Sequence, residues 1–167
     1  MPQFRTGDMW TAYETAGLFL ITTNSTLTTD GRLVMGRGIA RQARDRFPGL
    51  DAALGAQIRT VCGSGGFYGL LISRRWPAAK LAAFQVKYHW RGPADFSLIT
   101  RSAIALTWWA RYHADCPICL NFPGIGNGGL ARTAVLPLLA ELPDNVTIWE
   151  VAAPPARIPG REDDERT

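Results

Sequence analysis

Apolar residues in this chain fall into short runs and helical stripes, separated by polar turns and glycine-rich loops. The run Leu-Phe-Leu-Ile-Thr at 18–22 is apolar at nearly every position, as is typical of a strand buried on both faces. Comparable runs bounded by turn-forming residues predict six strands in all, over residues 3–5, 18–22, 67–73, 81–87, 118–122 and 146–151.

Between these runs, apolar residues recur at helical spacing. Ile39, Ala43 and Phe47 form one stripe, and Pro48-Gly49 ends the segment that carries it. A second stripe follows Asp95, a plausible N-cap. We therefore expect a short helix or turn at 8–15 and helices over 38–47, 50–61, 96–113 and 129–142.

Strands that alternate with helices predict an α/β domain, with a mixed, largely parallel sheet and helices on both faces. In that architecture, ligands bind at the carboxyl ends of the strands. Three candidate motifs follow strands in this way, beginning at Asn24, Lys87 and Gly124. Their convergence on one edge of the sheet favours a single binding site.

Composition narrows the class of protein. At 167 residues, with 47% apolar and 19% charged residues, the chain is long enough for one globular domain, expected over 1–153. Residues 154–167, rich in Pro, Gly and charge, are expected to be a disordered tail. No apolar run is long enough to cross a bilayer and the N-terminus has no signal-peptide pattern, so we expect a cytoplasmic protein without a membrane partner. The compact size and the solvated tail favour a monomer. A net charge of +4 mildly favours an anionic partner.

The cysteines do not predict a metal site. Cys116-Pro-Ile-Cys119 has the spacing of a zinc knuckle, but no second pair of ligands is present. The simpler interpretation is two small residues entering a buried strand. We therefore expect neither a metal nor a cofactor.

Two glycine-rich segments predict an anion site. Val34-Met-Gly-Arg-Gly-Ile-Ala40 precedes one predicted helix, and Asn121-Phe-Pro-Gly-Ile-Gly-Asn-Gly-Gly-Leu130 opens another. Glycines let backbone N–H groups approach a diphosphate closely. Neither segment matches a P-loop or a dinucleotide fingerprint. The alternative is that these glycines only shape turns.

Polar side chains near these loops suggest a ligand that carries a base and a sugar. Lys87 precedes His89, Trp90 and Arg91, where cations lower the pKa of an amine and aromatic rings can stack on bases. A solvated basic strand end is the alternative. Asp8 could accept from an exocyclic amine or simply cap a helix. Asn24 could hold a sugar hydroxyl or form a turn.

Taken together, these motifs resemble the macrodomain family, which binds ADP-ribose and often hydrolyses its linkage to a target. Gly7-Asp8, Thr22-Thr23-Asn24 and both glycine loops occur in the family's order, over about residues 3–151. The resemblance implies a three-layer α/β/α macrodomain. Lys87-Tyr-His-Trp-Arg91 is most similar to the branch of DarG-type antitoxins, which remove ADP-ribose from thymidine in DNA.

The resemblance also implies roles for particular residues. Asp8 would bind the adenine amine, and Lys87 with Asn24 would act at the distal ribose. Nucleic acid would meet His89, Trp90 and Arg91. The remaining ligand-binding residues would flank the diphosphate: Met35, Gly36, Arg37, Gly38 and Ile39 on one side, and Gly124, Ile125, Gly126, Asn127 and Gly128 on the other.

Several positions depart from the family pattern. Ile21 replaces an asparagine, Gln85-Val86 replaces Pro-Thr, the loop 25–33 is longer, and Gly128 stands where related glycohydrolases carry an acid. The implied function is a metal-independent hydrolase acting on ADP-ribosylated DNA, with ADP-ribose as ligand and product. A hydrolase of ADP-ribosyl esters on protein Glu or Asp, or a non-catalytic ADP-ribose reader, remains the alternative.

Overall fold

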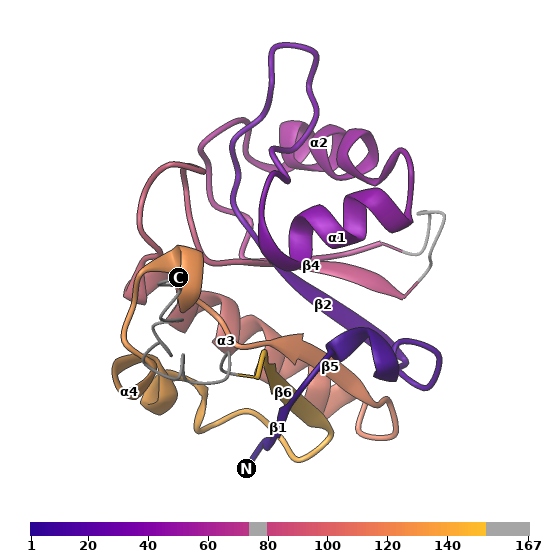
Figure 1. The fold of residues 1–167 in the computed structure, drawn as a ribbon, viewed down its shortest axis with the longest axis vertical. Helices are drawn as coiled ribbons and strands as arrows, with labels where there is room; N and C mark the ends of the chain where they lie inside the picture. Colours follow the sequence, from indigo (N-terminus) through magenta and orange to yellow (C-terminus); the bar gives the residue numbers. More distant parts are fainter. Residues whose placement is uncertain (74–79, 153–167) are drawn as a thin grey trace, which may run out of the picture.

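A computed structural model describes residues 1–73 and 80–152. Its sheet has six strands in the order β1-β6-β5-β2-β4-β3 (Figure 1). Neighbouring strands are parallel except β3, which runs antiparallel to β4 at one edge. The strands are β1 (Gln3–Thr6), β2 (Leu18–Thr23), β3 (Leu70–Ile72), β4 (Leu81–Gln85), β5 (Ile118–Asn121) and β6 (Val146–Glu150).

Helices cover both faces of this sheet, and the predicted three-layer α/β/α architecture with a mixed, largely parallel sheet is confirmed. The α-helices are α1 (Gly38–Arg46), α2 (Leu50–Val61), α3 (Phe96–Tyr112) and α4 (Arg132–Val135). Three 3-10 helices complete the set: η1 (Met9–Ala12), η2 (Gly126–Gly128) and η3 (Leu136–Leu139).

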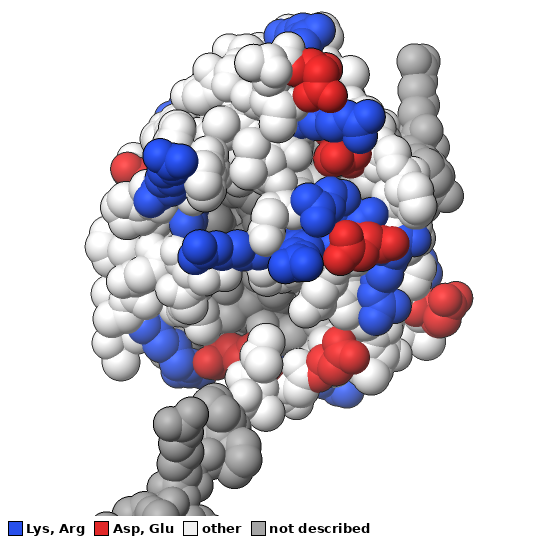
Figure 2. Space-filling model, turned by 45° about the horizontal axis from the view of Figure 1, so that its top comes forward, with Lys and Arg blue, Asp and Glu red and all other residues white. Residues whose placement is uncertain are grey.

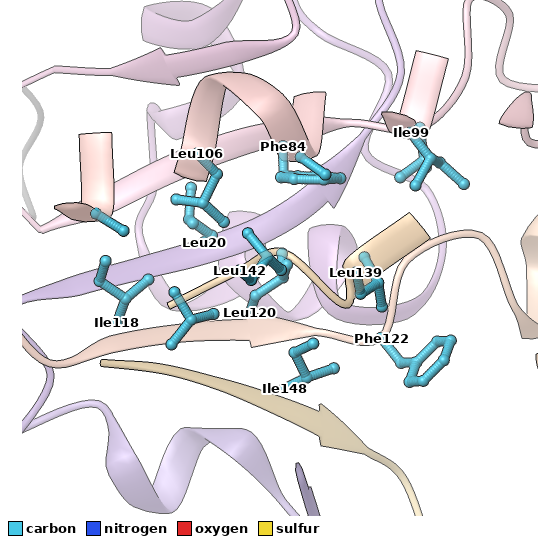
Figure 3. Packing of buried hydrophobic residues seen from close by; sticks show 14 of the residues in the cluster. Leu20, Phe84, Ile99, Leu106, Ile118, Leu120, Phe122, Leu139, Leu142 and Ile148 are labelled. Carbon is cyan, nitrogen blue, oxygen red and sulfur yellow. The ribbon is translucent and has the colours of Figure 1, made fainter. Parts of the chain in front are cut away.

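Alternation along the central strands builds the two cores. In β2, Phe19 and Ile21 face α1 and α2, whereas Leu18 and Leu20 face α3. All of these side chains are at most 2% exposed. Figure 3 shows the second core, where Leu20 and Phe84 from the sheet pack beside helical Leu106, Ile99 and Leu139. Burial on both faces explains why β2 is apolar almost throughout.

The predicted helix over 129–142 is wrong. Residue Gly129 has a left-handed φ of 74°, and α4 begins only at Arg132 and lasts four residues. The chain then tightens into η3, where Pro137 stands at the N-terminus and cannot donate to an α-helical hydrogen bond. The apolar spacing does mark buried positions, since Val135 and Leu139 are both buried, but these residues belong to two short helices, α4 and η3.

Other boundaries differ by only a few residues. The strands predicted over 67–73 and 81–87 shrink to β3 and β4, and the segment predicted over 8–15 contains η1. Asp95 does cap α3, since its Oδ1 accepts from the Leu98 N–H at 2.8 Å. Between the strands predicted over 67–73 and 81–87, the sequence favours a turn at Trp76-Pro77, which lies outside the described residues, as does the predicted tail over 154–167.

Candidate functional site

Three loops meet where the central strands end. Since β5, β2 and β4 are parallel neighbours, the segments that follow Asn121, Thr23 and Gln85 emerge at the same edge of the sheet. Together with η1, the end of β6 and the start of α1, they line a cavity of about 1170 Å³. On the face shown in Figure 2, basic side chains gather beside a hollow.

Almost all of the predicted site residues line this cavity. His89 alone does not; its ring stacks beside Trp90 with centroids 6.2 Å apart. The predicted residues that line it are Asp8, Asn24, Met35, Gly36, Arg37, Gly38, Ile39, Lys87, Trp90, Arg91, Gly124, Ile125, Gly126, Asn127 and Gly128.

The first glycine loop leaves backbone donors free. Gly38 opens α1 with a left-handed φ of 59°, and the N–H groups of Gly36, Gly38 and Ile39 have no acceptor among the described residues. A Cβ on Gly36 would meet nothing within 4 Å, so the cavity beside it is open. The start of a nine-residue α-helix with exposed donors suits an anion.

The second glycine loop presents its donors around the 3-10 helix η2, and not at the start of an α-helix. Gly128 N donates to Ile125 O at 3.2 Å and Leu130 N to Gly124 O at 3.0 Å, which closes the loop on itself. The loop therefore does not pass directly into an α-helix at Gly129 as expected, since α4 begins only at Arg132. The N–H groups of Ile125, Gly126 and Asn127 find no acceptor in the described residues.

The two glycine loops approach each other across the cavity. A Cβ placed on Gly38 would lie 3.7 Å from the side-chain Nδ2 of Asn127. Two sets of unpaired N–H groups therefore face a common space from opposite sides, since both loops line the same cavity. Such an arrangement can hold a ligand with two linked anionic groups.

Lys87 is held beside the second loop. Its Nζ donates to the carbonyl of Asn127 at 2.9 Å, and its side chain is half-buried. Burial, and secondarily the nearby Arg37 guanidinium, lower the pKa of Lys87 below the ordinary lysine value. Both causes raise the fraction of neutral amine, the form that acts as a nucleophile or base.

Gln85 fixes the backbone that carries Lys87. Fully buried, it accepts from Tyr68 N and Gly69 N through Oε1, at 2.8 and 3.0 Å. Its Nε2 donates to Gly66 O and Lys87 O, at 2.9 and 3.2 Å. Every polar group of this amide is thus satisfied, and the end of β4 is tied to the loop before β3. The departure from the family pattern at 85 is therefore a structural clamp.

Asn24 and Asp8 also have structural partners. Asn24 donates to Val34 O and accepts from Thr26 N, at 2.9 and 2.8 Å, as a turn former does. Its amide retains one further hydrogen and one lone pair towards the cavity it lines. Asp8 caps η1 by accepting from Trp10 N at 3.0 Å through Oδ1. The other oxygen, Oδ2, has no partner among the described residues.

Sequence reasoning missed several residues of the wall. Asn121 bridges two strands, accepting from Thr22 N at 2.9 Å and donating to Thr22 Oγ1 at 2.7 Å. Trp149 lies under Gly7, and its Nε1 is buried. The acidic wall residue Glu150 pairs with Arg132 at 2.7 Å. Asn121 had a local signal as a polar residue ending an apolar strand, whereas Trp149 had none.

Trp90 and Arg91 complete the lining of the cavity. They belong to a segment of aromatic and cationic residues, Tyr88–Arg91, which we call the aromatic shelf. The guanidinium of Arg91 lies 4.7 Å from the centre of the Trp90 ring, and the His89 ring stacks beside the same Trp90 ring. Trp90 remains 39% exposed and Tyr88 37% exposed, so both rings keep a face or an edge for a partner.

The described residues hold no group of three or more His, Cys, Asp and Glu side chains that could bind a metal ion. Cys119 is buried in β5 and Cys116 is half-buried, and burial raises the pKa of both thiols. Within the part of the chain that the structure describes, no helix is long and apolar enough to cross a membrane.

Comparison with solved structures identifies the fold. The macrodomain of Thermus aquaticus DarG is 25% identical, covers 92% of this chain and 99% of its own, and superposes with a TM-score of 0.68. The macrodomain of Mycobacterium tuberculosis DarG is 26% identical over 89% and 97%, with a TM-score of 0.66. Thermosipho africanus DarTG in complex with ADP-ribose is 19% identical over 90% and 42%, with a TM-score of 0.67.

This chain therefore has the fold of the DarG macrodomains along nearly its whole length, and the resemblance predicted from its motifs is confirmed. No protein-family model matches the sequence, and no curated protein matches it either.

Proposed function

We propose that this protein is a metal-independent hydrolase that removes ADP-ribose from modified thymidine in DNA. The likeness to DarG macrodomains supports an ADP-ribose-binding macrodomain, and one solved relative holds that ligand. The observation that carries the catalytic proposal is the Lys87 amine, held between a phosphate-type loop and the aromatic shelf with a lowered pKa.

The two glycine loops would bind the diphosphate. Unpaired N–H groups on both, together with the Arg37 side chain, offer positive potential without bulky side chains between them. At the β1–β6 end of the cavity, the free Oδ2 of Asp8 would accept from the adenine amine. The Trp149 indole supplies an apolar wall beside it.

Lys87 would act on the anomeric carbon of the distal ribose. The bond from this carbon to the base breaks, the hydroxyl of a water molecule adds to the carbon, and the water's proton ends on the base. Binding energy from the diphosphate and adenine would hold the ribose in place for this step. A lowered pKa lets the amine attack or take a proton near neutral pH.

Among the described residues, Lys87 has no carboxylate partner. The acidic residues that line the cavity are Asp8 and Glu150. Glu150 ends β6, three strand positions from β4, or about 14 Å at the usual strand spacing. Gly128 stands where related glycohydrolases carry an acid. A Cβ built on Gly128 would lie 3.1 Å from Ala94 Cβ. The arrangement supports chemistry centred on a single lysine.

The aromatic shelf favours DNA over protein as the carrier of ADP-ribose. Trp90 and Tyr88 offer ring surface to bases, and the Arg91 guanidinium offers charge to phosphates. The sequence offers two further cations for the DNA strand, Arg74 and Arg75, and both lie outside the described residues. Phosphate contacts predict that turnover on DNA falls as salt rises.

Turnover of an oligonucleotide ADP-ribosylated on thymidine tests the proposal directly, with wild type beside Lys87→Ala. Release of ADP-ribose by the wild type and its loss in the variant are expected. A peptide carrying ADP-ribosyl glutamate serves as the competing substrate. Release from the peptide alone would replace DNA with protein. Tight ADP-ribose binding without release from either substrate would leave a non-catalytic reader.

A further inference from the structure

The aromatic shelf has no regular secondary structure, yet it is anchored at several points. Residues 86–95 contain neither helix nor strand. One anchor is the contact of Lys87 Nζ with Asn127 O, and another is Ala94 N donating to Gly128 O at 2.9 Å. These contacts hold the two ends of the segment against the second glycine loop. They leave the middle, at Tyr88 and Trp90, to be held from elsewhere.

Two hydroxyl groups hold that middle. Ser25 is fully buried, and its Oγ donates to Tyr88 O at 3.1 Å. Thr26 Oγ1 accepts from Trp90 N at 3.1 Å and lies 3.4 Å from Tyr88 O, to which it donates. The Thr26 hydroxyl therefore bridges the residues on both sides of His89 and fixes the turn that orients the Trp90 ring.

Thr26 is itself rigidly placed. Its N–H donates to Asn24 Oδ1 at 2.8 Å, and its carbonyl accepts from Val34 N at 3.0 Å. Asn24 Nδ2 closes the same loop by donating to Val34 O at 2.9 Å. A hydroxyl fixed in this way sets the position of the shelf, since it loses little entropy when it bonds.

We propose that Thr26 is a positioning residue, which holds the aromatic shelf at the angle that receives the nucleic-acid part of the substrate. This inference rests on the proposed function, because it assigns the shelf to DNA. The Thr26 hydroxyl, which the experiment below removes, bonds to Tyr88 O and Trp90 N and to no atom of the diphosphate loops or of Lys87. It should therefore govern how tightly DNA is held and leave ADP-ribose binding and the chemical step unchanged.

The experiment compares Thr26→Val, which keeps the shape but removes the hydroxyl, with Thr26→Ser, which keeps the hydroxyl. Thr29→Val is the matched control, since Thr29 lies on the same loop, is exposed and makes no hydrogen bond among the described residues. Three quantities are measured: amide hydrogen exchange at Trp90, KM and kcat on the ADP-ribosylated oligonucleotide, and the Kd of free ADP-ribose.

For Thr26→Val we expect exchange at Trp90 to quicken and KM to rise, each about three- to tenfold, as loss of one hydrogen bond implies. The kcat and the Kd of ADP-ribose should stay at wild-type values. Thr26→Ser should restore both changed quantities, and Thr29→Val should change none. A merely structural role would instead move the ADP-ribose Kd and kcat together with KM.

Unchanged exchange at Trp90, or faster exchange with an unchanged KM, would overturn the positioning role. If the wild type releases no ADP-ribose, the proposed hydrolase fails, and the Kd of the ADP-ribosylated oligonucleotide replaces KM. The role of Thr26 in holding DNA then stands or falls on whether that Kd rises in Thr26→Val and recovers in Thr26→Ser.

Discussion

The two glycine loops look alike in sequence, but the structure requires a glycine at Gly124 in the second loop and not at Gly36 in the first. Gly36 in the first loop has open space where a Cβ would lie, and no left-handed torsion requires a glycine there. Gly124 in the second loop has a φ of 78°, and a Cβ would lie 2.6 Å from Ile99 Cδ1 and 3.0 Å from Leu130 Cδ1. The described fold therefore requires a glycine at Gly124 and gives no reason for one at Gly36.

This difference distinguishes a glycine that the backbone conformation and packing require from one that only a bound ligand would require. Backbone strain and crowding explain Gly124 without any ligand. No contact or torsion among the described residues requires a glycine at Gly36, as expected if the proposed ligand approaches the backbone there. Lys87 joins the two sides, because it contacts the second loop and is electrostatically coupled to Arg37 of the first.

The largest expected effect comes from removing the amine between the loops. Lys87→Arg keeps the charge but holds its proton throughout the accessible pH range, so it separates amine chemistry from charge stabilisation. We expect turnover to fall about 10²- to 10⁴-fold, as for loss of a general acid or base. Lys80→Arg is the matched control, since the chain has only these two lysines.

Near-normal single-turnover rates for Lys87→Arg would show that a fixed positive charge suffices. Lys80, whose Nζ lies 4.3 Å from the Tyr13 ring, should tolerate the change.

The second-largest effect is expected from a substitution that disrupts the packing of the second glycine loop. Gly124→Ala should lower the free energy of unfolding by about 2 to 5 kcal/mol, the sum of a left-handed torsion and overpacking against the core. Gly126→Ala is the matched control, because φ is 63° there but a Cβ meets nothing. It should cost only the torsion, about 1 to 2 kcal/mol. Equal unfolding midpoints in urea for the two variants would contradict the packing argument.

A smaller effect isolates the first loop. Gly36→Ala should leave the free energy of unfolding unchanged or raise it by about 0.5 kcal/mol, since the unfolded chain loses freedom. The added methyl enters the cavity, so we expect the Kd of ADP-ribose to rise about tenfold. Isothermal titration calorimetry measures the affinity and urea denaturation the stability. Unchanged affinity would mean that no ligand approaches this backbone.

The smallest effect is a displacement of the pH profile of kcat. Arg37→Gln removes one of the two causes that lower the pKa of Lys87, so that pKa should rise while burial still holds it below its ordinary value. If the neutral amine acts, the rising limb of the profile moves to higher pH. If the ammonium acts, the falling limb moves in the same direction.

Arg41→Gln, one helical turn further along α1 and ion-paired with Asp45 at 3.8 Å, is the control and should leave the profile in place. A profile for Arg37→Gln that stays put, measured at saturating substrate, would place the guanidinium out of electrostatic reach of the amine.

Much of the fold and of the candidate site could be predicted from local patterns. The strand at 18–22 and the helix after Asp95 were read correctly because burial periodicity and capping depend on neighbours in the sequence. The helix predicted over 129–142 failed because a left-handed Gly129 and Pro137 override an apolar stripe. Trp149 was missed because nothing near it in sequence marks it as part of a cavity.

The sequence by itself determined which residues sit at strand ends and which glycines could turn, because torsional preference and hydrophobic spacing are local properties. The tertiary structure alone decided which of them meet. Asn121 pairs with Thr22 across 99 residues, and Lys87 reaches Asn127 across 40. Such partners follow from the strand order and the crossovers between parallel strands, which bring distant segments to one edge of the sheet.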